Sequence, residues 1–258
     1  MIPKIIHYCW LSGDEYPEVI KECLSSWKKY LPDYEIWLWD TKRFNVESTL
    51  WTKQAFETKK YAFAADYIRL YALYNYGGIY LDSDISVFKS FDDLLHLPYF
   101  IGQEYIGAME PAIIGAEKGL PWIGDVLKRY ENRPFIKQDG SLDTYPLPDV
   151  FFDELYHKYS FRRADSQSKY EWDDNTIWVF NSHYFNSRNC IGPHRWPESY
   201  CSHIYAGSWM PKGKGLKAYI IKHVPKCLLK AYFDIAHNLI YKDKIHQHDP
   251  FYQNKKKK

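Results

Sequence analysis

Two aspartates one residue apart, Asp82 and Asp84, follow a short apolar run in the segment YGGIYLDSDISV at residues 76–87. If this segment continues as a strand, alternate side chains share a face, so Tyr80, Asp82 and Asp84 project together. Two carboxylates at this spacing repel each other unless a cation lies beside them. Mg²⁺ and Mn²⁺ prefer oxygen ligands and leave room in their shell for substrate phosphates. The pattern therefore favours a metal that bridges a diphosphate, with a solvated strand end as the plainer alternative.

Three other readings of the acid pair can be weighed. An EF-hand loop starting at Asp82 is excluded, because Val87 replaces its glycine at position six and Asp93 its glutamate at position twelve. A haloacid-dehalogenase-like phosphatase with Asp82 as nucleophile stays open, but only Asp173 and Asp174 offer its later acidic loop. A retaining glycosidase needs carboxylates about 5 Å apart across a sugar ring. Neighbouring acids in one segment do not straddle a ring well.

The chain before the acid pair predicts a helix that leads into it. Apolar periodicity from Thr52 to Asn75 predicts one long helix, which Gly77 is placed to end. On that helix Asp66 and Arg69 are three residues apart and share a face. They form either a surface ion pair of small effect or part of the crevice around the acids.

The wider pattern alternates strands and helices. We predict strands at residues 4–10, 34–40 and 79–82, with helices at 17–31 and 52–75 between them. This order indicates an α/β fold with a parallel sheet, in which ligands gather at the carboxyl ends of the strands. Later strands and helices are predicted at residues 99–104, 111–117, 121–133, 148–159 and 177–185.

Composition limits the class of protein. The 258 residues include 10 Trp, 24 Tyr and 14 Phe, an aromatic content that suits either a packed core or stacking on sugar rings. A carbohydrate-binding protein without catalysis is therefore one alternative. The five cysteines are scattered and form no C-x-x-C pair, which favours reduced thiols in a cytoplasmic compartment. No signal peptide or membrane span is expected from the apolar runs.

Charge is distributed unevenly along the chain. Residues 212–258 contain twelve lysines and three aspartates, whereas residues 1–211 carry an excess of acids. We predict a globular domain over 1–211 and a basic amphipathic helical tail over 212–258. The tail either packs on the domain or lies on an anionic membrane. We expect a cytoplasmic protein, peripheral at the inner face of the membrane, with no nucleic-acid partner.

Three stretches together resemble one family. The opening IPKIIHYCWLSG resembles its first strand, AADYIR with GGIYLDSD resembles its central motif, and ESYCSHIYAGSW resembles its late H-x-x-x-G-S-W segment. They span residues 2–209 and resemble the DXD-containing sugar transferases of glycosyltransferase family 32. That family includes Golgi mannosyltransferases, bacterial capsule and lipopolysaccharide enzymes and, more remotely, the clostridial glucosylating toxins. The resemblance implies a GT-A type nucleotide-sugar-binding fold with a mainly parallel central sheet.

The resemblance also implies a role for each matching residue. Asp84 is expected to ligate Mn²⁺ or Mg²⁺, with His203 as a later ligand or a diphosphate contact. Asp82, Asp84 and Arg69 are the expected catalytic residues, and Asp82 and Arg69 are also expected to bind the donor. The other expected donor-binding residues are Trp10 against the base, Asp66 and Tyr80 at the nucleoside and sugar, and Ser208 and Trp209 at the leaving phosphate or the metal.

The implied activity is retaining transfer of a sugar from a nucleotide-diphosphate donor, with UDP-sugars favoured. The expected acceptor is a glycan or a lipid-linked saccharide in surface polysaccharide synthesis. Two positions depart from the family's pattern: Pro111 stands near a frequent asparagine, and Leu120 replaces the histidine of a Gly-His-Pro. Residues that select the sugar are therefore not predicted.

Overall fold

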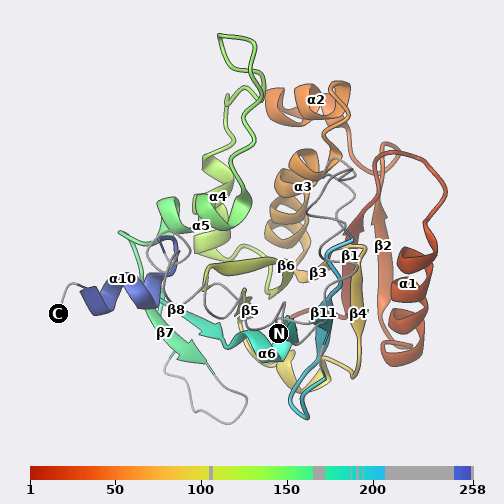
Figure 1. Ribbon diagram of the computed structural model, residues 1–258, viewed down its shortest axis with the longest axis vertical. Coiled ribbons are helices and arrows are strands. Elements are labelled where there is room, and N and C mark those ends of the chain that lie inside the picture. The colour runs from red at the N-terminus through yellow and green to blue at the C-terminus, as the bar shows by residue number, and fades with distance from the viewer. Residues whose placement is uncertain are drawn as a thin grey trace, which may run out of the picture.

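A seven-stranded sheet forms the centre of the computed structural model, in the order β2–β1–β3–β6–β5–β8–β7 (Figure 1). The structure describes residues 1–104, 107–164, 172–186, 188–189, 192–193, 195–206 and 247–256. In sheet order the strands are β2 (Glu35–Trp39), β1 (Ile5–Cys9), β3 (Gly78–Leu81), β6 (Met109–Ala116), β5 (Tyr99–Gln103), β8 (Thr176–Phe180) and β7 (Ser160–Ala164). Strand β6 is antiparallel to both neighbours, and the other pairs are parallel. The predicted α/β class with a mainly parallel central sheet is confirmed.

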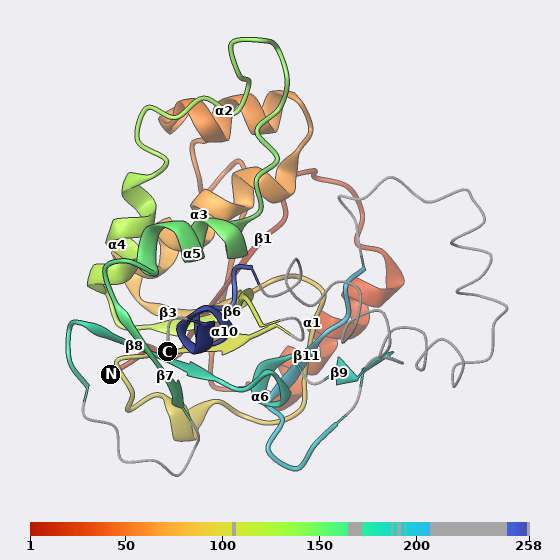
Figure 2. The ribbon, with the colours of Figure 1, turned by 60° about the vertical axis from the view of Figure 1, so that its left-hand side comes forward.

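Helices cover both faces of this sheet (Figure 2). On one face, buried side chains of the sheet pack against α2 (Leu50–Glu57), α3 (Tyr61–Tyr76), α4 (Pro121–Lys128) and α5 (Leu147–Leu155). On the other face lie α1 (Glu18–Tyr30), α6 (Ser182–Phe185) and the short helix η2 (Asp92–Leu94). Tyr80 belongs to the first core, and its neighbours Ile79 and Leu81 belong to the second. Because side chains along β3 point alternately to the two faces of the sheet, this strand contributes to both apolar cores.

The single long helix predicted over residues 52–75 is two helices in the structure. Helix α2 ends at Glu57 and α3 begins at Tyr61. Between them the Thr58 hydroxyl donates to the Gln54 carbonyl over 2.7 Å, and Lys59 adopts a left-handed φ of 57°. A left-handed residue cannot continue a right-handed helix, so the chain turns there.

Two adjacent glycines allow β3 to begin against β1. Gly77 ends α3 with a φ of 67°, as predicted, and Gly78 follows with a φ of 107°. A Cβ on Gly78 would lie 2.7 Å from the Ile5 carbonyl oxygen and 2.9 Å from Nε2 of His7. Only glycine fits this approach, and the strand that leads to the acid pair is thereby placed beside β1.

His7 is fully buried at this contact. Its Nε2 lies 2.7 Å from the Gly77 carbonyl oxygen, and its Nδ1 accepts a hydrogen bond from the Trp39 indole over 3.1 Å. Both ring nitrogens are satisfied only if the imidazole is neutral with its proton on Nε2. Burial is the main reason that the pKa of His7 falls to about 4.

We expect this histidine to make folding stability depend on pH. Between pH 6.5 and 4 the unfolded chain takes up a proton at His7 that the folded chain does not, so the free energy of unfolding falls as the pH is lowered. The loss attributable to His7 approaches about 1.4 kcal/mol per pH unit. Urea unfolding of the native chain and of His7→Gln at pH 7, 6 and 5 tests this. Equal pH slopes for the two proteins would contradict it.

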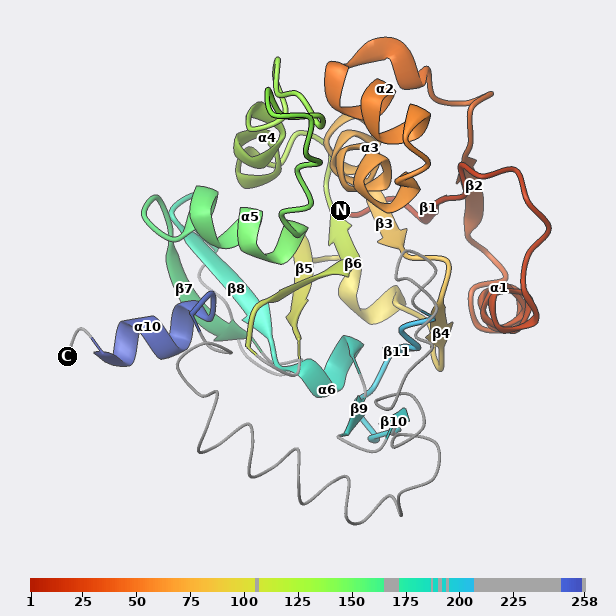
Figure 3. The same ribbon diagram turned by 45° about the horizontal axis from the view of Figure 1, so that its top comes forward.

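A short antiparallel ladder lies outside the main sheet (Figure 3). Strand β4 (Ile85–Val87) pairs with β11 (Cys201–His203), which brings a late segment of the chain beside the acid pair. Smaller elements complete the described chain: the helix η1 (Val46–Ser48) and the strands β9 (Arg188–Asn189) and β10 (Gly192–Pro193), which pair with each other.

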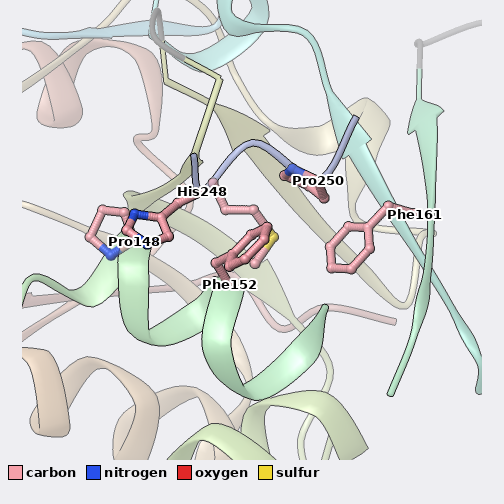
Figure 4. A pocket seen from close by; sticks show the side chains of 6 residues that line it. Pro148, Phe152, Phe161, His248 and Pro250 are labelled. Atoms are coloured by element: carbon pink, nitrogen blue, oxygen red, sulfur yellow. The ribbon is translucent and has the colours of Figure 1, made fainter. Parts of the chain in front are cut away.

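The described end of the chain packs on the body of the protein. Helix α10 (Pro250–Lys256) follows His248, whose Nδ1 lies 2.5 Å from the Asp149 carboxylate of α5. The Arg163 guanidinium of β7 lies 3.7 Å from the centre of the Phe251 ring. Figure 4 shows the small apolar pocket at this contact, lined by Met109, Pro148, Phe152, Phe161, His248 and Pro250.

Most of the predicted tail lies outside the described residues, because these omit 207–246. The boundary between residues 211 and 212, the helical character of the tail and its contact with a membrane therefore stay predictions. Within the described part of the chain, the helices are too short or too polar to cross a bilayer.

Candidate functional site

The two acids lie in a tight turn, not along a strand as predicted. Strand β3 ends at Leu81, and the turn is closed by a 3.0 Å hydrogen bond from the Ile85 amide to the Asp82 carbonyl. A second bond, from the Asp82 amide to the Ala112 carbonyl of β6, measures 2.8 Å. The strand interpretation fails because β3 and β4 are separate strands in separate sheets. The acids still stand at the carboxyl end of a central strand, where ligands of α/β sheets gather.

His203 completes a cluster with the two acids. Ligand atoms of Asp82, Asp84 and His203 all lie within 4.8 Å of one another. Nε2 of His203 is 3.3 Å from Oδ1 of Asp84. The backbone fixes this meeting, because the Ile204 amide donates to the Asp84 carbonyl over 3.0 Å and the Ala206 amide donates to the Asp84 carboxylate over 2.8 Å.

These three residues fit a hard divalent cation. Ligands about 2.1 Å from an octahedral ion and at right angles to each other are about 3 Å apart. The 3.3 Å between Asp84 and His203 is close to that separation. Two carboxylates and one imidazole form a donor set that suits Mn²⁺ well and Mg²⁺ adequately. Asp84 and His203 would hold such an ion, as the resemblance implied.

Arg69 joins α3 to the acid turn. Its Nη2 lies 3.0 Å from Asp66 and 3.3 Å from Asp82, and its Nη1 donates to the Pro111 carbonyl over 2.9 Å. Tyr80 donates its hydroxyl hydrogen to the Asp82 carboxylate over 2.9 Å, below the Arg69 guanidinium. Asp66 and Arg69 are 9% and 5% exposed, so the alternative of a surface ion pair is excluded. Through Arg69 the pair contacts Asp82, which agrees with the other alternative, that the pair belongs to the surroundings of the acids.

Burial raises the pKa of each of these carboxyls and nearby positive charge lowers it, and the balance differs from one carboxyl to the next. Burial raises the pKa of Asp66 to about 7, although Arg69 opposes the change. Burial also raises the pKa of Asp82, again against Arg69. At Asp84 burial acts in the same sense, but the hydrogen bond and charge of His203 outweigh it and lower the pKa. Asp84, the acid that lies nearest His203, is therefore kept ionised, as a metal ligand must be.

His203 responds to the same charges. Burial alone would lower the pKa of its imidazole, but Glu110 and Asp84 raise it well above the usual value. Nδ1 of His203 lies 3.5 Å from the Glu110 carboxylate, on the side of the ring away from Asp84. The histidine is thus held between two carboxylates, one in the turn and one in β6.

The other predicted donor residues divide into two groups. Trp10 follows β1, the parallel neighbour of β3, so it stands at the same edge of the sheet as the acid turn. Its indole donates to the Asp14 carbonyl over 2.8 Å, and its ring packs 4.9 Å from that of Tyr16. Ser208 and Trp209 lie outside the described residues.

Glu110 and Pro111 are site residues that the sequence analysis missed as such. Glu110 is the one charged side chain in the apolar run MEPAIIGA of β6 and is 1% exposed. Burial of an acid in a strand costs free energy unless the acid has partners. The single acid in this apolar run was therefore the feature of the sequence that could have indicated a functional residue. Pro111 was noted only as a departure from the family pattern, whereas its carbonyl anchors Arg69. A contact made by a backbone carbonyl cannot be predicted from the type of residue that carries it.

Comparison with known proteins identifies the class of this region. Residues 17–101 match the family model described as "Glycosyltransferase sugar-binding region containing DXD motif". The match includes Asp66, Arg69, Tyr80, Asp82 and Asp84. It confirms the predicted resemblance to the DXD-containing glycosyltransferases.

The relatives carry names of the same class. The chain is 33% identical over 131 residues to Inositol phosphoceramide mannosyltransferase 3 of Schizosaccharomyces pombe, covering 49% of this chain and 36% of the relative. It is 26% identical over 198 residues to Inositol phosphoceramide mannosyltransferase 2 of the same yeast, covering 70% of this chain and 56% of the relative. It therefore spans well under two thirds of these relatives.

Two further matches cover more of the compared protein. An uncharacterised glycosyltransferase of Acanthamoeba polyphaga mimivirus is 26% identical over 240 residues, or 85% of this chain and 88% of the viral protein. Among solved structures, one titled "PaToxG Glycosyltransferase" aligns with a TM-score of 0.47 and 24% identity, over 60% of this chain and 69% of the other.

Proposed function

We propose that this protein is a metal-dependent retaining glycosyltransferase that moves a sugar from a nucleotide-diphosphate donor to an acceptor hydroxyl. The observation that carries the proposal is the cluster of Asp82, Asp84 and His203 at the carboxyl end of β3, whose two acids lie inside the region of the DXD glycosyltransferase type. A bound divalent cation would offset the negative charge that develops on the departing diphosphate.

In this proposal the chain's own residues divide the work. Asp84 and His203 hold the cation, and their backbone ties keep the two ligands in register. Asp82 faces the donor hydroxyls, because Tyr80 and Arg69 already fix its carboxylate in one orientation. Arg69 acts as a positioning residue, since its nitrogens are engaged by Asp66, Asp82 and the Pro111 carbonyl.

The donor and the acceptor are proposed on other grounds. UDP-sugars are the favoured donors on the family resemblance. The names of the yeast relatives add mannose to the sugars to test and an inositol-containing sphingolipid to the acceptors. We propose a glycan or lipid-linked acceptor in surface polysaccharide synthesis, with the enzyme cytoplasmic and peripheral at the inner membrane face. Sedimentation of the full chain with anionic but not neutral vesicles at low salt tests that location.

The donor proposal can be tested by thermal unfolding. UDP-sugars, with GDP-sugars in parallel, are expected to stabilise the protein in the presence of Mn²⁺ and much less in its absence. A donor at a hundred times its Kd stabilises the folded state by about 2.7 kcal/mol. Absence of stabilisation by every nucleotide sugar, with and without Mn²⁺, would refute the proposal.

The two alternatives predict different results, one in a turnover assay and one in the same thermal screen. A phosphatase would turn over simple phosphomonoesters and leave a phosphoaspartate at Asp82. Its carboxylate is already engaged by Tyr80 and Arg69, which disfavours a nucleophilic role. A carbohydrate-binding protein without catalysis would be stabilised by free sugars, irrespective of nucleotide and metal.

A further inference from the structure

Glu110 lies beside His203, at the ring nitrogen away from Asp84, and contacts the chain from several directions. Its carboxylate accepts hydrogen bonds from the Asn186 amide over 2.8 Å, the Tyr205 hydroxyl over 3.1 Å and the Ala112 backbone amide over 3.2 Å. It also lies 3.5 Å from Nδ1 of His203. Glu110 is 1% exposed, so hydrogen bonds to these partners replace the hydration that its carboxylate would have in water.

The ring of His203 is restrained on three sides. One face stacks on the Tyr205 ring, with centroids 3.8 Å apart and an interplanar angle of 19°. Its Nε2 points to Asp84, and its Nδ1 points to Glu110. Nδ1 is buried and makes no hydrogen bond of ordinary geometry to the described residues. The Glu110 carboxylate, 3.5 Å away, is the acceptor that faces it.

We propose that Glu110 is a positioning residue that keeps the proton of His203 on Nδ1 and so directs the lone pair of Nε2 to the cation beside Asp84. A neutral imidazole has one donor and one acceptor nitrogen, and the partner of one nitrogen decides which tautomer is present. Histidines that bind metals commonly donate their other N–H to a carboxylate, which also makes the ligating nitrogen more basic. The inference rests on the proposed metal-dependent function and adds a residue from β6 to it.

Direct coordination by Glu110 is the competing assignment, and the geometry disfavours it. The oxygen of Glu110 that faces His203, Oε2, lies 3.5 Å from Nδ1, whereas Asp84 lies at Nε2 on the other side of the ring. Glu110 is also absent from the group of ligand atoms that lie within 4.8 Å of one another. The carboxylate therefore would contact a bound cation only through His203.

Glu110 also fastens the segment that carries His203. Tyr205, which bonds to Glu110, has a left-handed φ of 56°. A bulky residue adopts this conformation only where its surroundings impose it. The Tyr205 hydroxyl bond to Glu110 and the Ala206 amide bond to Asp84 hold the backbone on either side of that residue.

The experiment compares Mn²⁺ binding in the absence of any substrate. Free Mn²⁺ is measured by electron paramagnetic resonance for the native chain, Glu110→Gln and Glu110→Ala, with Glu57→Gln as a control at the exposed end of α2. We expect Glu110→Ala to weaken Mn²⁺ binding by about 10- to 100-fold. Glu110→Gln, which keeps an acceptor oxygen for Nδ1–H, should recover part of the loss, and the control should match the native chain.

The tautomer itself gives a second readout that does not depend on a folded variant. In ¹⁵N-histidine-labelled native protein with Mg²⁺, His203 should carry its proton on Nδ1. A proton on Nε2 overturns the inference, and so does native Mn²⁺ affinity in a folded Glu110→Ala variant. If the native chain binds Mn²⁺ and the variants bind it equally, only the role of Glu110 fails. If the native chain binds no Mn²⁺, the proposed metal dependence fails with it.

Discussion

Replacing Asp84 with asparagine is expected to lower nucleotide-sugar turnover by about 100-fold or more and to abolish its response to Mn²⁺. Asp84 is the acid nearest His203, and the His203 side chain and the Ala206 amide keep its pKa low. An asparagine keeps the shape but removes the charge that binds the cation. Loss of the cation removes several kcal/mol of stabilisation from the developing diphosphate charge, which corresponds to a rate factor of this size. Donor hydrolysis with and without Mn²⁺ measures the effect.

Two comparisons make this result specific to the site. Asp33→Asn, at an exposed residue between α1 and β2, should retain the native rate and the native metal response. Asp82→Asn should bind Mn²⁺ but bind the donor poorly, because Asp82 is oriented by Tyr80 and Arg69. If Asp84→Asn kept both its rate and its Mn²⁺ dependence, Asp84 would not be a metal ligand.

Arg69→Gln is expected to destabilise the protein by about 3–5 kcal/mol, the usual cost of removing one partner from a buried ion pair. The guanidinium is 5% exposed and lies between Asp66 and Asp82. Without it, the buried Asp66 and the partly buried Asp82 lose the cation that lies between them. The free energy of unfolding in urea at pH 7 gives the size of the effect.

A second variant and a matched pair test the cause. Asp66→Asn together with Arg69→Gln should be less destabilised than Arg69→Gln alone, because one of the unpaired charges is gone. Lys128→Gln breaks another pair three residues apart on a helix, with Asp125, but that lysine is 69% exposed. It should cost less than about 1 kcal/mol. Similar losses for Lys128→Gln and Arg69→Gln would contradict the importance of burial.

Much of the site was predictable because it depends on local spacing. Three residues along a helix place Asp66 and Arg69 on one face, and Gly77 ends that helix where its position predicted. The depth of the pair was not predictable in the same way. Burial depends on β6, which passes below it at a sequence distance of more than forty residues.

The errors have physical causes of the same kind. Tyr80, Asp82 and Asp84 follow a period of two, but the hydrogen bond from Ile85 to Asp82 bends the chain before that period can continue. Lys59 breaks the predicted helix because its φ is left-handed. The identity of a lysine does not predict such a conformation. His203 was placed by the resemblance, whereas Glu110, which lies behind it, belongs to no motif that the resemblance covered.

The pairing of β4 with β11 determines how late during synthesis the candidate site can assemble. Asp84 meets its partners 119 to 122 residues later in the chain, at His203 and Ala206. Chains leave the ribosome from the N-terminus at about 5–20 residues per second. For several seconds the nascent chain therefore exposes the acid turn without its histidine. Asp84 can therefore meet His203 and Ala206 only after all seven strands of the central sheet have emerged.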